Sequence, residues 1–326
     1  MSITIKKYTD TDSQSWDTFV KSSNNGTIFH YRSFLSYHIE RKFVDYSLIF
    51  EKKGKIIALL SAAEMIDKSN KTLCSHPGAT FGGFIYDDIT FEDTDEIIVN
   101  LLEYCKNLGF SSIFLVQAPQ LYNLRKNETL EYALHWHGFE AEETYFSSFI
   151  DLACEKEVIN LVSSRKKRYL KKNFPNEKLR FEWNGDLDEF YPILCENKKK
   201  HGCIPTHSKA ELKKLMVLMP ENFYLLMMYK DDEAIGGTFN YIANTQVGII
   251  FYNMINYAFE EFNPASFQIL ETMKWGKIKN LKYLDFGVSQ LPQAENPLSP
   301  SPNLIRFKEQ FSAKGMLRVA LRKNLK

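Results

Sequence analysis

The sequence is poor in cysteine, and the pattern of its few thiols argues against a disulfide-stabilised protein and against a zinc-binding protein. Its 326 residues include 5 cysteines, an odd and scattered set without a C-x-x-C pair: Cys74, Cys105, Cys154, Cys195 and Cys203. Reduced thiols and a cytoplasmic protein are therefore expected. Cys195 and Cys203 lie near His201 and His207, but this spacing matches no standard zinc pattern, so no metal site is predicted.

A large net charge of either sign is also lacking. The 41 basic and 40 acidic residues give a formal charge of +1 at pH 7. A protein that binds mainly nucleic acid usually carries a clear basic excess. DNA is therefore not an expected partner, and any contact with RNA must come from a local basic patch.

Long apolar runs are missing as well. No run reaches the roughly 18 residues that a membrane-spanning helix needs, and the first residues lack the apolar core of a signal peptide. What is present is typical of a globular chain, with 44% hydrophobic and 25% charged residues. The 25 Phe and 17 Tyr can build large cores or line a groove with rings.

The order of predicted elements in the first half recurs in the second. A hairpin over Lys53-Gly54 precedes a helix from Glu92 to Leu108 and a strand from Ser112 to Gln117. The second half has the same elements at Asp231-Asp232, at Pro264 to about Lys279 and at Tyr283 to Val288. The offset is about 170–180 residues, one domain length. We predict a duplicated α/β fold with mixed sheets, divided into domains 1–153 and 154–326.

A glycine-rich segment from Ser75 to Gly83 is the candidate ligand loop of the first half. The N–H groups of Gly82 and Gly83 can form an anion-binding concavity. His76 can shuttle a proton or bond a hydroxyl. The alternative is a tight strand crossing with a hydrogen-bonded histidine.

Two features of the second half can bind phosphates. The run from Arg165 to Lys172 is strongly basic and includes Lys166, which suits a nucleotide, a lipid headgroup or RNA. The alternative is a solvated helix face. The helix opened by Asn263-Pro264-Ala265-Ser266 offers free N–H groups to an anion, which brings in Ser266.

Candidate substrate-binding residues lie around one strand of the second half. Tyr252 and Asn253 are near the carboxyl end of a predicted strand, where open α/β sheets collect ligands. His207 belongs to the segment from Asn197 to Ser208, which is either a substrate loop or an ordinary connector.

Candidate catalytic residues follow near the C-terminus. Asp285 lies inside an apolar strand, where a carboxylate is costly unless it is paired or used, so it is either a base or the anchor of a turn. A proline-rich, lid-like loop from Ser289 leads to Arg306 and Lys308. Lys308 can stabilise an oxyanion, or it is a surface lysine.

These last motifs resemble a known family. Y-L-D-F-G-V-S from Tyr283, the loop after it and L-I-R-F-K-E-Q-F up to Phe311 look like the C-terminal half of FemA/FemB-like acyltransferases of the GNAT superfamily. The segments from Trp16 to His30 and from Ser75 to Gly83 resemble the same group, especially bacterial members linked to surface-polysaccharide synthesis.

The resemblance implies two tandem GNAT domains with a cleft between them, which would take in Tyr252, Asn253 and the glycine-rich loop. It also implies transfer of an acyl or aminoacyl group from a thioester or aminoacyl-tRNA to an amine, with Lys308 on the family's F-K-x-x-F lysine. Two family features are absent: the loop Arg/Gln-x-x-Gly-x-Gly/Ala and a long charged helical hairpin.

The leading hypothesis is an N-acyltransferase with no tightly bound cofactor. It would move an acyl group from acyl-CoA to an amine of a cell-envelope or polysaccharide precursor such as an amino sugar, nucleotide-linked or in peripheral contact with a membrane. Asp285 or His76 would take the proton and Lys308 would steady the oxyanion. The alternatives are an aminoacyl-tRNA-dependent transferase and a non-catalytic protein that binds a glycan or nucleotide-sugar.

Overall fold

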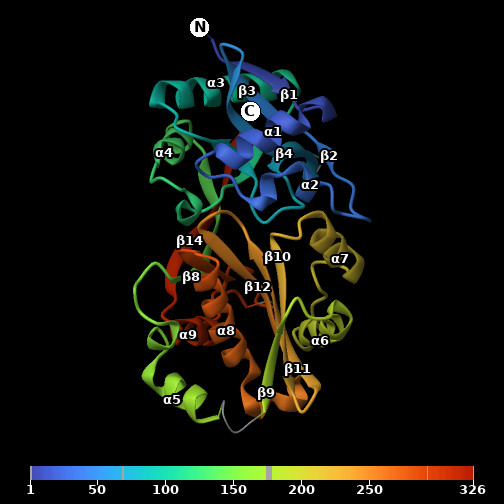
Figure 1. Ribbon diagram of the computed structural model, residues 1–326. Helices are drawn as coiled ribbons and strands as arrows, with labels where there is room; N and C mark the ends of the chain where they lie inside the picture. Colours follow the sequence, from blue (N-terminus) through green and yellow to red (C-terminus); the bar gives the residue numbers. More distant parts are fainter. Residues whose placement is uncertain (1, 68–69, 174–177, 292, 326) are drawn as a thin grey trace. The chain divides into compact units, whose positions relative to one another are not determined.

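The computed structural model describes residues 2–67, 70–173, 178–291 and 293–325 (Figure 1). The chain forms two compact units: unit 1 comprises Met1–Thr144 and Arg318–Lys326, and unit 2 comprises Tyr145–Leu317. The boundary expected from the sequence lay between residues 153 and 154 and kept the whole C-terminus in the second domain. The structure instead returns the end of the chain to unit 1.

Unit 1 is built on a mixed sheet with the strand order β1-β3-β4-β5-β7-β14, and β2 and β6 also pair with β4. Neighbours from β1 to β5 are antiparallel, whereas β5 and β7 are parallel. The strands are β1 (Thr4–Lys7), β2 (Val44–Asp45), β3 (Leu48–Lys52), β4 (Lys55–Asp67), β5 (Asn70–Ser75), β6 (Gly83–Tyr86), β7 (Ser112–Val116), the first part of β8 (Glu140–Asp151) and the last part of β14 (Lys314–Asn324). The helices are α1 (Ser13–Ser22), α2 (Arg32–Leu35), α3 (Phe91–Asn107) and α4 (Thr129–Trp136).

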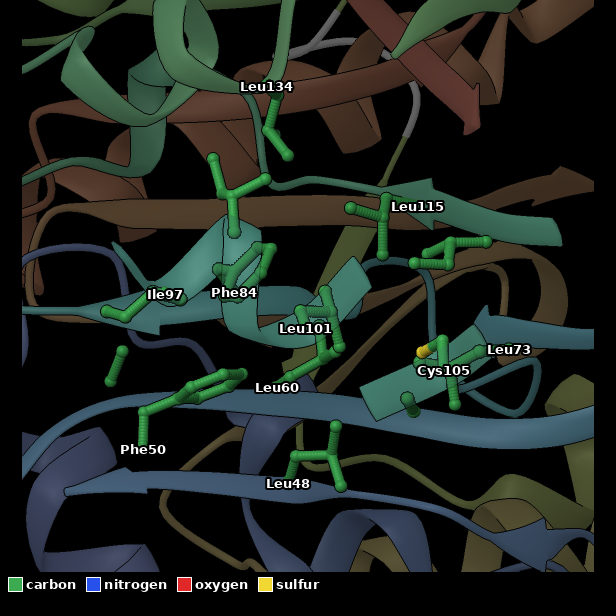
Figure 2. Close-up of a cluster of buried hydrophobic side chains, with 14 of the residues drawn as sticks. Leu48, Phe50, Leu60, Leu73, Phe84, Ile97, Leu101, Cys105, Leu115 and Leu134 are labelled. Carbon is green, nitrogen blue, oxygen red and sulfur yellow. The ribbon is translucent and has the colours of Figure 1, made fainter. Parts of the chain in front are cut away.

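Neighbouring side chains of the β3–β4 hairpin fill two cores on opposite faces of this sheet. Phe50 packs with Leu101 of α3 on one face, whereas Ile49 packs with Trp16 of α1 on the other. Because successive strand residues point to opposite faces, both sides of these apolar strands are buried. Figure 2 shows the larger core, in which side chains converge from β3, β4, β5, β7, α3 and α4.

Unit 2 has a mixed sheet with the order β8-β13-β12-β11-β10-β9, in which β12 and β13 are parallel and the other neighbouring pairs are antiparallel. Its strands are β9 (Leu179–Trp183), β10 (Phe223–Lys230), β11 (Glu233–Ile242), β12 (Val247–Ile255) and β13 (Tyr283–Val288), with parts of β8 and β14. Its helices are α5 (Ser164–Asn173), α6 (Leu187–Lys200), α7 (Lys209–Leu218), α8 (Pro264–Ile278) and α9 (Pro302–Glu309).

Helices cover both faces of the unit 2 sheet (Figure 1). The two adjacent glycines of β11 show which helix lies on which face. A Cβ at Gly236 would meet Gln268 of α8, and a Cβ at Gly237 would meet Phe190 of α6. We call these the α8 face and the α6 face.

The two units repeat one plan, as the sequence order predicted. Lys55 and Glu233 begin the second hairpin strands, 178 residues apart, and Ser112 and Tyr283 begin the strands after the long helices, 171 apart. In each unit the strand after the long helix is parallel to a strand that precedes this helix, β5 in unit 1 and β12 in unit 2, although the short strand β6 comes between β5 and α3 in unit 1. A side-chain detail also repeats. The Asn25 amide bonds Phe84 and Tyr86 backbone atoms of β6, and the Asn197 amide bonds both backbone atoms of Ile255.

The repeat explains why the C-terminus belongs to unit 1. In plan, β14 is the second copy of β8, yet β14 pairs with β7 through residues such as Ala320 opposite Val116. In turn β8 pairs with β13, with Ile150 opposite Leu284. Each unit therefore takes its last strand from the other half of the sequence.

Most predicted elements are confirmed, among them β13 with its predicted bounds and Pro264 at the first turn of α8. The sequence also predicts a helix from Leu187 to Lys200, which is α6, and a capping box between Ser208 and Glu211, which is observed. The sequence also predicts a helix near Tyr31 to Ile39, and the observed helix, α2, is shorter. Strands β1, β2, β5, β6, β9 and β14 were not predicted. Within the described ranges no helix is long and apolar enough to span a bilayer.

Candidate active site

The parallel strands β12 and β13 separate in the middle of the unit 2 sheet. Their pairing ends with Ile249 opposite Asp285. Beyond this point β12 has a bulge, because Asn240 and Phe239 of β11 pair with Ile250 and Tyr252 and leave Phe251 without a partner in the register. Ligands of open α/β sheets bind at such carboxyl ends. The place where the strands part is therefore the first candidate site.

Asp285 anchors the turn at this place. Its side chain is fully buried, and one carboxylate oxygen accepts the N–H of Gly287 at 2.7 Å and the hydroxyl of Ser147 at 3.4 Å. Gly287 has a φ of 70°, which a residue with a side chain adopts only with strain. Of the two interpretations of Asp285, the anchor of a turn is observed, and the base stays a prediction.

Lys308 holds the same turn from α9. Only 3% of the residue is exposed, so the alternative of a surface lysine is wrong. Its ammonium donates to the carbonyls of Gly287 at 2.7 Å and Val288 at 3.0 Å. The two predicted catalytic residues Asp285 and Lys308 are thus brought to one turn, where one binds the N–H of Gly287 and the other its C=O.

A pocket of about 470 Å³ lies where α5, the start of α8 and the end of α9 meet. Its lining includes both predicted cationic residues, and the full set is Ser163, Arg165, Lys166, Tyr169, Asn263 and Gln310. The Lys166 ammonium donates to the Ser266 hydroxyl at 3.0 Å. The structure therefore brings together the three residues predicted to bind the donor: Arg165, Lys166 and Ser266.

The electrostatics of this pocket favour an anion. Burial lowers the pKa of Lys166, and the neighbouring Arg165 lowers it further, so both cations would gain from a negative ligand. Asn263, before α8, has a φ of 50° and makes no side-chain cap, and the first turn of α8 has no acid. The positive end of the helix dipole is therefore not neutralised by a side chain of α8.

The corresponding helix of unit 1 begins differently. The Thr90 hydroxyl caps α3 by accepting the N–H of Asp93, and Glu92 and Asp93 carry negative charge in the first turn. Lys52 pairs with Asp93. An anion would be repelled at α3, so of the two repeated helices only α8 suits one.

Tyr252 and Asn253 lie on opposite faces of β12. The Tyr252 hydroxyl is 3.1 Å from Nδ1 of His207, and burial raises the pKa of Tyr252 to about 12. Asn253 instead donates weakly to the Ala265 carbonyl of α8 at 3.5 Å. The structure thus groups Tyr252 with His207 on the α6 face and separates both from Asn253 on the α8 face.

The glycine-rich loop lies in unit 1 and is a tight strand crossing. The N–H of Gly82 donates to the Val116 carbonyl at 3.0 Å, so the predicted anion concavity is wrong for Gly82. Gly83 has a φ of 78°, and a Cβ there would collide with the side chain of Gln117. His76 accepts the N–H of Gly78 at 3.2 Å, and burial lowers its pKa to about 4.

Two further predicted residues have other surroundings. Ser289 is fully buried, and its backbone bonds Phe146 at 3.0 Å and Ser301 at 2.8 Å, which ties down the base of the proline-rich loop. Arg306 is exposed on α9 and does not line the pocket. Among the residues that the structure describes, no group of three or more His, Cys, Asp or Glu could hold a metal ion.

Several pocket residues were not predicted from the sequence. Tyr169 and Ser163 flank the basic residues of α5, and Gln310 follows α9. Their only signal was proximity to charged or proline-rich motifs, because nothing local in the sequence relates α5, α8 and α9.

Comparisons with known proteins bear on the fold. No family model matches the chain, and no curated protein matches it. Among solved structures it is similar to FemX, with a TM-score of 0.72 and 12% identity over 98% of this chain and 97% of that one. It also resembles the C-terminal domain of a putative lysylphosphatidylglycerol synthetase from Agrobacterium fabrum, with a TM-score of 0.60 and 11% identity over 96% and 92%.

A third similar structure is a tandem GNAT protein from the clavulanic acid biosynthesis pathway, with a TM-score of 0.57 and 9% identity over 100% and 99% of the two chains. At these identities the likeness defines the fold alone. The chain has the FemX-like tandem GNAT fold, which is the fold that the sequence resemblance implied.

Proposed function

We propose that this chain is an N-acyltransferase that moves an acyl group from acyl-CoA to an amine of a cell-envelope or polysaccharide precursor, such as an amino sugar. The observation that carries the proposal is the pocket at the start of α8, lined by Arg165 and Lys166 and bordered by Ser266. In a tandem GNAT fold, such a pocket offers the phosphates of a donor two cations and a helix N-terminus.

The chemistry is assigned to the turn that Asp285 and Lys308 hold. The amine nitrogen attacks the thioester carbon, the carbonyl oxygen becomes an oxyanion, and the thiolate leaves as the amide forms. Asp285 takes the proton that the amine loses, and Lys308 stabilises the oxyanion. His76 belongs to unit 1, and burial lowers its pKa to about 4, which makes it a weaker base than an ordinary histidine.

Release of thiol from acyl-CoA in the presence of amino sugars tests the proposal. Lys166→Glu is expected to raise the KM for acyl-CoA by at least about tenfold, because it places a carboxylate where the phosphates bind. Lys171→Glu is the matched control, since Lys171 is an exposed residue of the same helix outside the pocket. No thiol release with any acyl-CoA and amine would reject the CoA donor.

The second candidate is an aminoacyl-tRNA donor, which the composition of α5 favours. The helix has no acid in its first turn and a run of basic residues, of which Arg168, Lys171 and Lys172 are exposed. RNA affinity depends on phosphate contacts over such a surface. A gel shift with charged tRNA that Lys171→Glu weakens would favour this donor, because the acyl-CoA proposal predicts no effect of that change.

One result would point away from both enzymes. Thermal stabilisation by a nucleotide-sugar, with no transfer from acyl-CoA or from charged tRNA, would indicate a binding protein that keeps the fold without the chemistry.

A further inference from the structure

Lys198 is a half-buried lysine beside an aromatic ring on the α6 face. It lies in the last turn of α6, its side chain is half-buried, and its ammonium is 5.5 Å from the centre of the Tyr252 ring. Burial lowers the pKa of Lys198, and the nearby Cys203 thiol raises it by less.

Within the described part of the chain, no carboxylate pairs with this ammonium and no hydrogen bond to it is found. Other shielded lysines have partners: Lys52 pairs with Asp93, Lys166 bonds Ser266, and Lys308 bonds two carbonyls. A half-buried charge without a partner is costly, and the Tyr252 ring offsets only part of that cost. An anion beside this ammonium would offset the rest of that cost.

The backbone holds Lys198 in this place. Asn197, one residue earlier, bonds both backbone atoms of Ile255 at 2.6 and 3.3 Å and so ties the end of α6 to the end of β12. The carbonyl of Lys198 accepts the N–H groups of His201 at 3.1 Å and Cys203 at 2.9 Å. The backbone of Lys198 is thus fixed, and its ammonium lies beside the carboxyl half of β12.

Hydrogen-bonding groups lie at the hydroxyl end of the same ring. The Tyr252 hydroxyl is 3.1 Å from Nδ1 of His207, and Thr206 also bonds this hydroxyl. The His207 and Thr206 bonds fix the Tyr252 ring, and a half-buried cation beside a fixed aromatic ring matches an anionic group of a ligand.

We propose that Lys198 binds an anionic group of the acceptor, a carboxylate or a phosphate, beside Tyr252 on the α6 face. That the ligand is the acceptor rests on the proposed function, whereas the anion site itself does not depend on it. The site is separate from the donor pocket, because Tyr252 and Asn253 point to opposite faces of β12 and the pocket lies at the start of α8.

Residue-resolved labelling of lysine amines tests the proposal on the intact chain. A trace of acetic anhydride is added at about pH 8, with inorganic phosphate, with malonate, or with sodium chloride at equal ionic strength, and labelled peptides are quantified by mass spectrometry. An anion that raises the pKa of Lys198 by one unit lowers its free amine about tenfold. We expect labelling of Lys198 to fall by about threefold to tenfold, and that of the exposed neighbour Lys199 to stay unchanged.

The two anions distinguish the sources. Protection by phosphate alone indicates a phosphate-bearing acceptor, and protection by malonate alone indicates a carboxylate. Equal labelling of Lys198 in all three salts would overturn the proposal. Lys166 is an internal reference for the donor pocket. Protection of Lys166 without Lys198 supports the pocket and rejects this site. Protection of Lys198 without Lys166 supports this site and counts against the pocket.

Variants provide a second measurement. In a Lys166→Met background, phosphate or malonate is expected to raise the Tm, Lys198→Met to abolish the rise, and Lys199→Met to keep it. Methionine retains the apolar stem of lysine, so folding should persist. A rise that survives Lys198→Met would contradict the proposal.

Discussion

At the scale of residues, two side chains that are far apart in the sequence, Asp285 and Lys308, bind the same turn of β13. Asp285 accepts the N–H of Gly287, and Lys308 donates to the Gly287 carbonyl. Both are buried charged groups that need partners, and the polar backbone of the turn supplies them. A structural and a catalytic role for these residues are therefore compatible, and a substitution that keeps one role can test the other.

Asp285→Asn is such a substitution. The asparagine oxygen can still accept the Gly287 N–H, so we expect the unfolding free energy to fall by no more than about 1–2 kcal/mol. Without a carboxylate to take the proton, kcat should fall by about 10²–10⁴-fold. Urea unfolding and thiol release measure the two effects. Unchanged kcat in a folded Asp285→Asn protein would leave the carboxylate only its role in the turn.

Buried histidines predict how unit 1 responds to acid. Burial lowers the pKa values of His30 and His76 to about 4, below the ordinary 6.5 of an unfolded chain. Between these values the unfolded state binds more protons, so stability is complete above about pH 6.5 and is lost as the pH falls toward 4, by up to about 1.4 kcal/mol per pH unit for each histidine.

Urea unfolding of unit 1 at several pH values checks this prediction. His76→Asn should reduce the slope below pH 6.5 relative to the native chain, whereas His135→Asn, at an exposed position of α4, should not. An equal slope in His76→Asn and the native chain would contradict it.

At the scale of elements, two copies of one helix differ at their first turns. The start of α3 has a threonine cap and two acids, whereas α8 begins with Pro264 and without a side-chain cap. Local sequence predicted both helices, the first from its apolar spacing between Glu92 and Leu108 and the second from Pro264 at its first turn, because such patterns act within a few residues. That Lys166 meets Ser266 was not predictable locally, because the two lie 100 residues apart.

Ser266→Asp would make α8 resemble α3. Because Ser266 is fully buried and bonds Lys166, the new carboxylate should pair with that lysine, and the protein should stay folded. The KM for acyl-CoA should rise by about tenfold or more, because the helix start and Lys166 would already be neutralised. Calorimetric titration with CoA measures the affinity directly. Native affinity in the variant would place the donor phosphates elsewhere.

At the scale of the whole molecule, the duplicated plan is completed by exchanged last strands. Leu325 joins the core of unit 1, and Arg322 of β14 forms an ion pair with Glu142. Residues 318–325 therefore stabilise the first half of the sequence, which is distant from them along the chain.

Truncation after Leu317 tests this exchange. It removes the strand that pairs with β7 and exposes an open edge, so unit 1 should lose several kcal/mol of stability and become prone to aggregate. Hydrogen exchange is expected to accelerate at the β7 amides opposite the lost strand, while β10 and β11 of unit 2 keep their protection. Uniform loss of protection in both units would show that they unfold together.

The sequence by itself determined the elements and their repeated order. Apolar periodicity, Pro264 and the Asp231-Asp232 turn, whose residues have φ values of 48° and 65°, act over a few residues and could be seen directly. Only the tertiary structure decided which strand completes which sheet, that Lys308 is buried, that Tyr252 and Asn253 face opposite sides, and that α5 meets α8. Those outcomes depend on surfaces that segments distant in sequence bury together. A local sequence pattern does not identify the distant segment that packs against it.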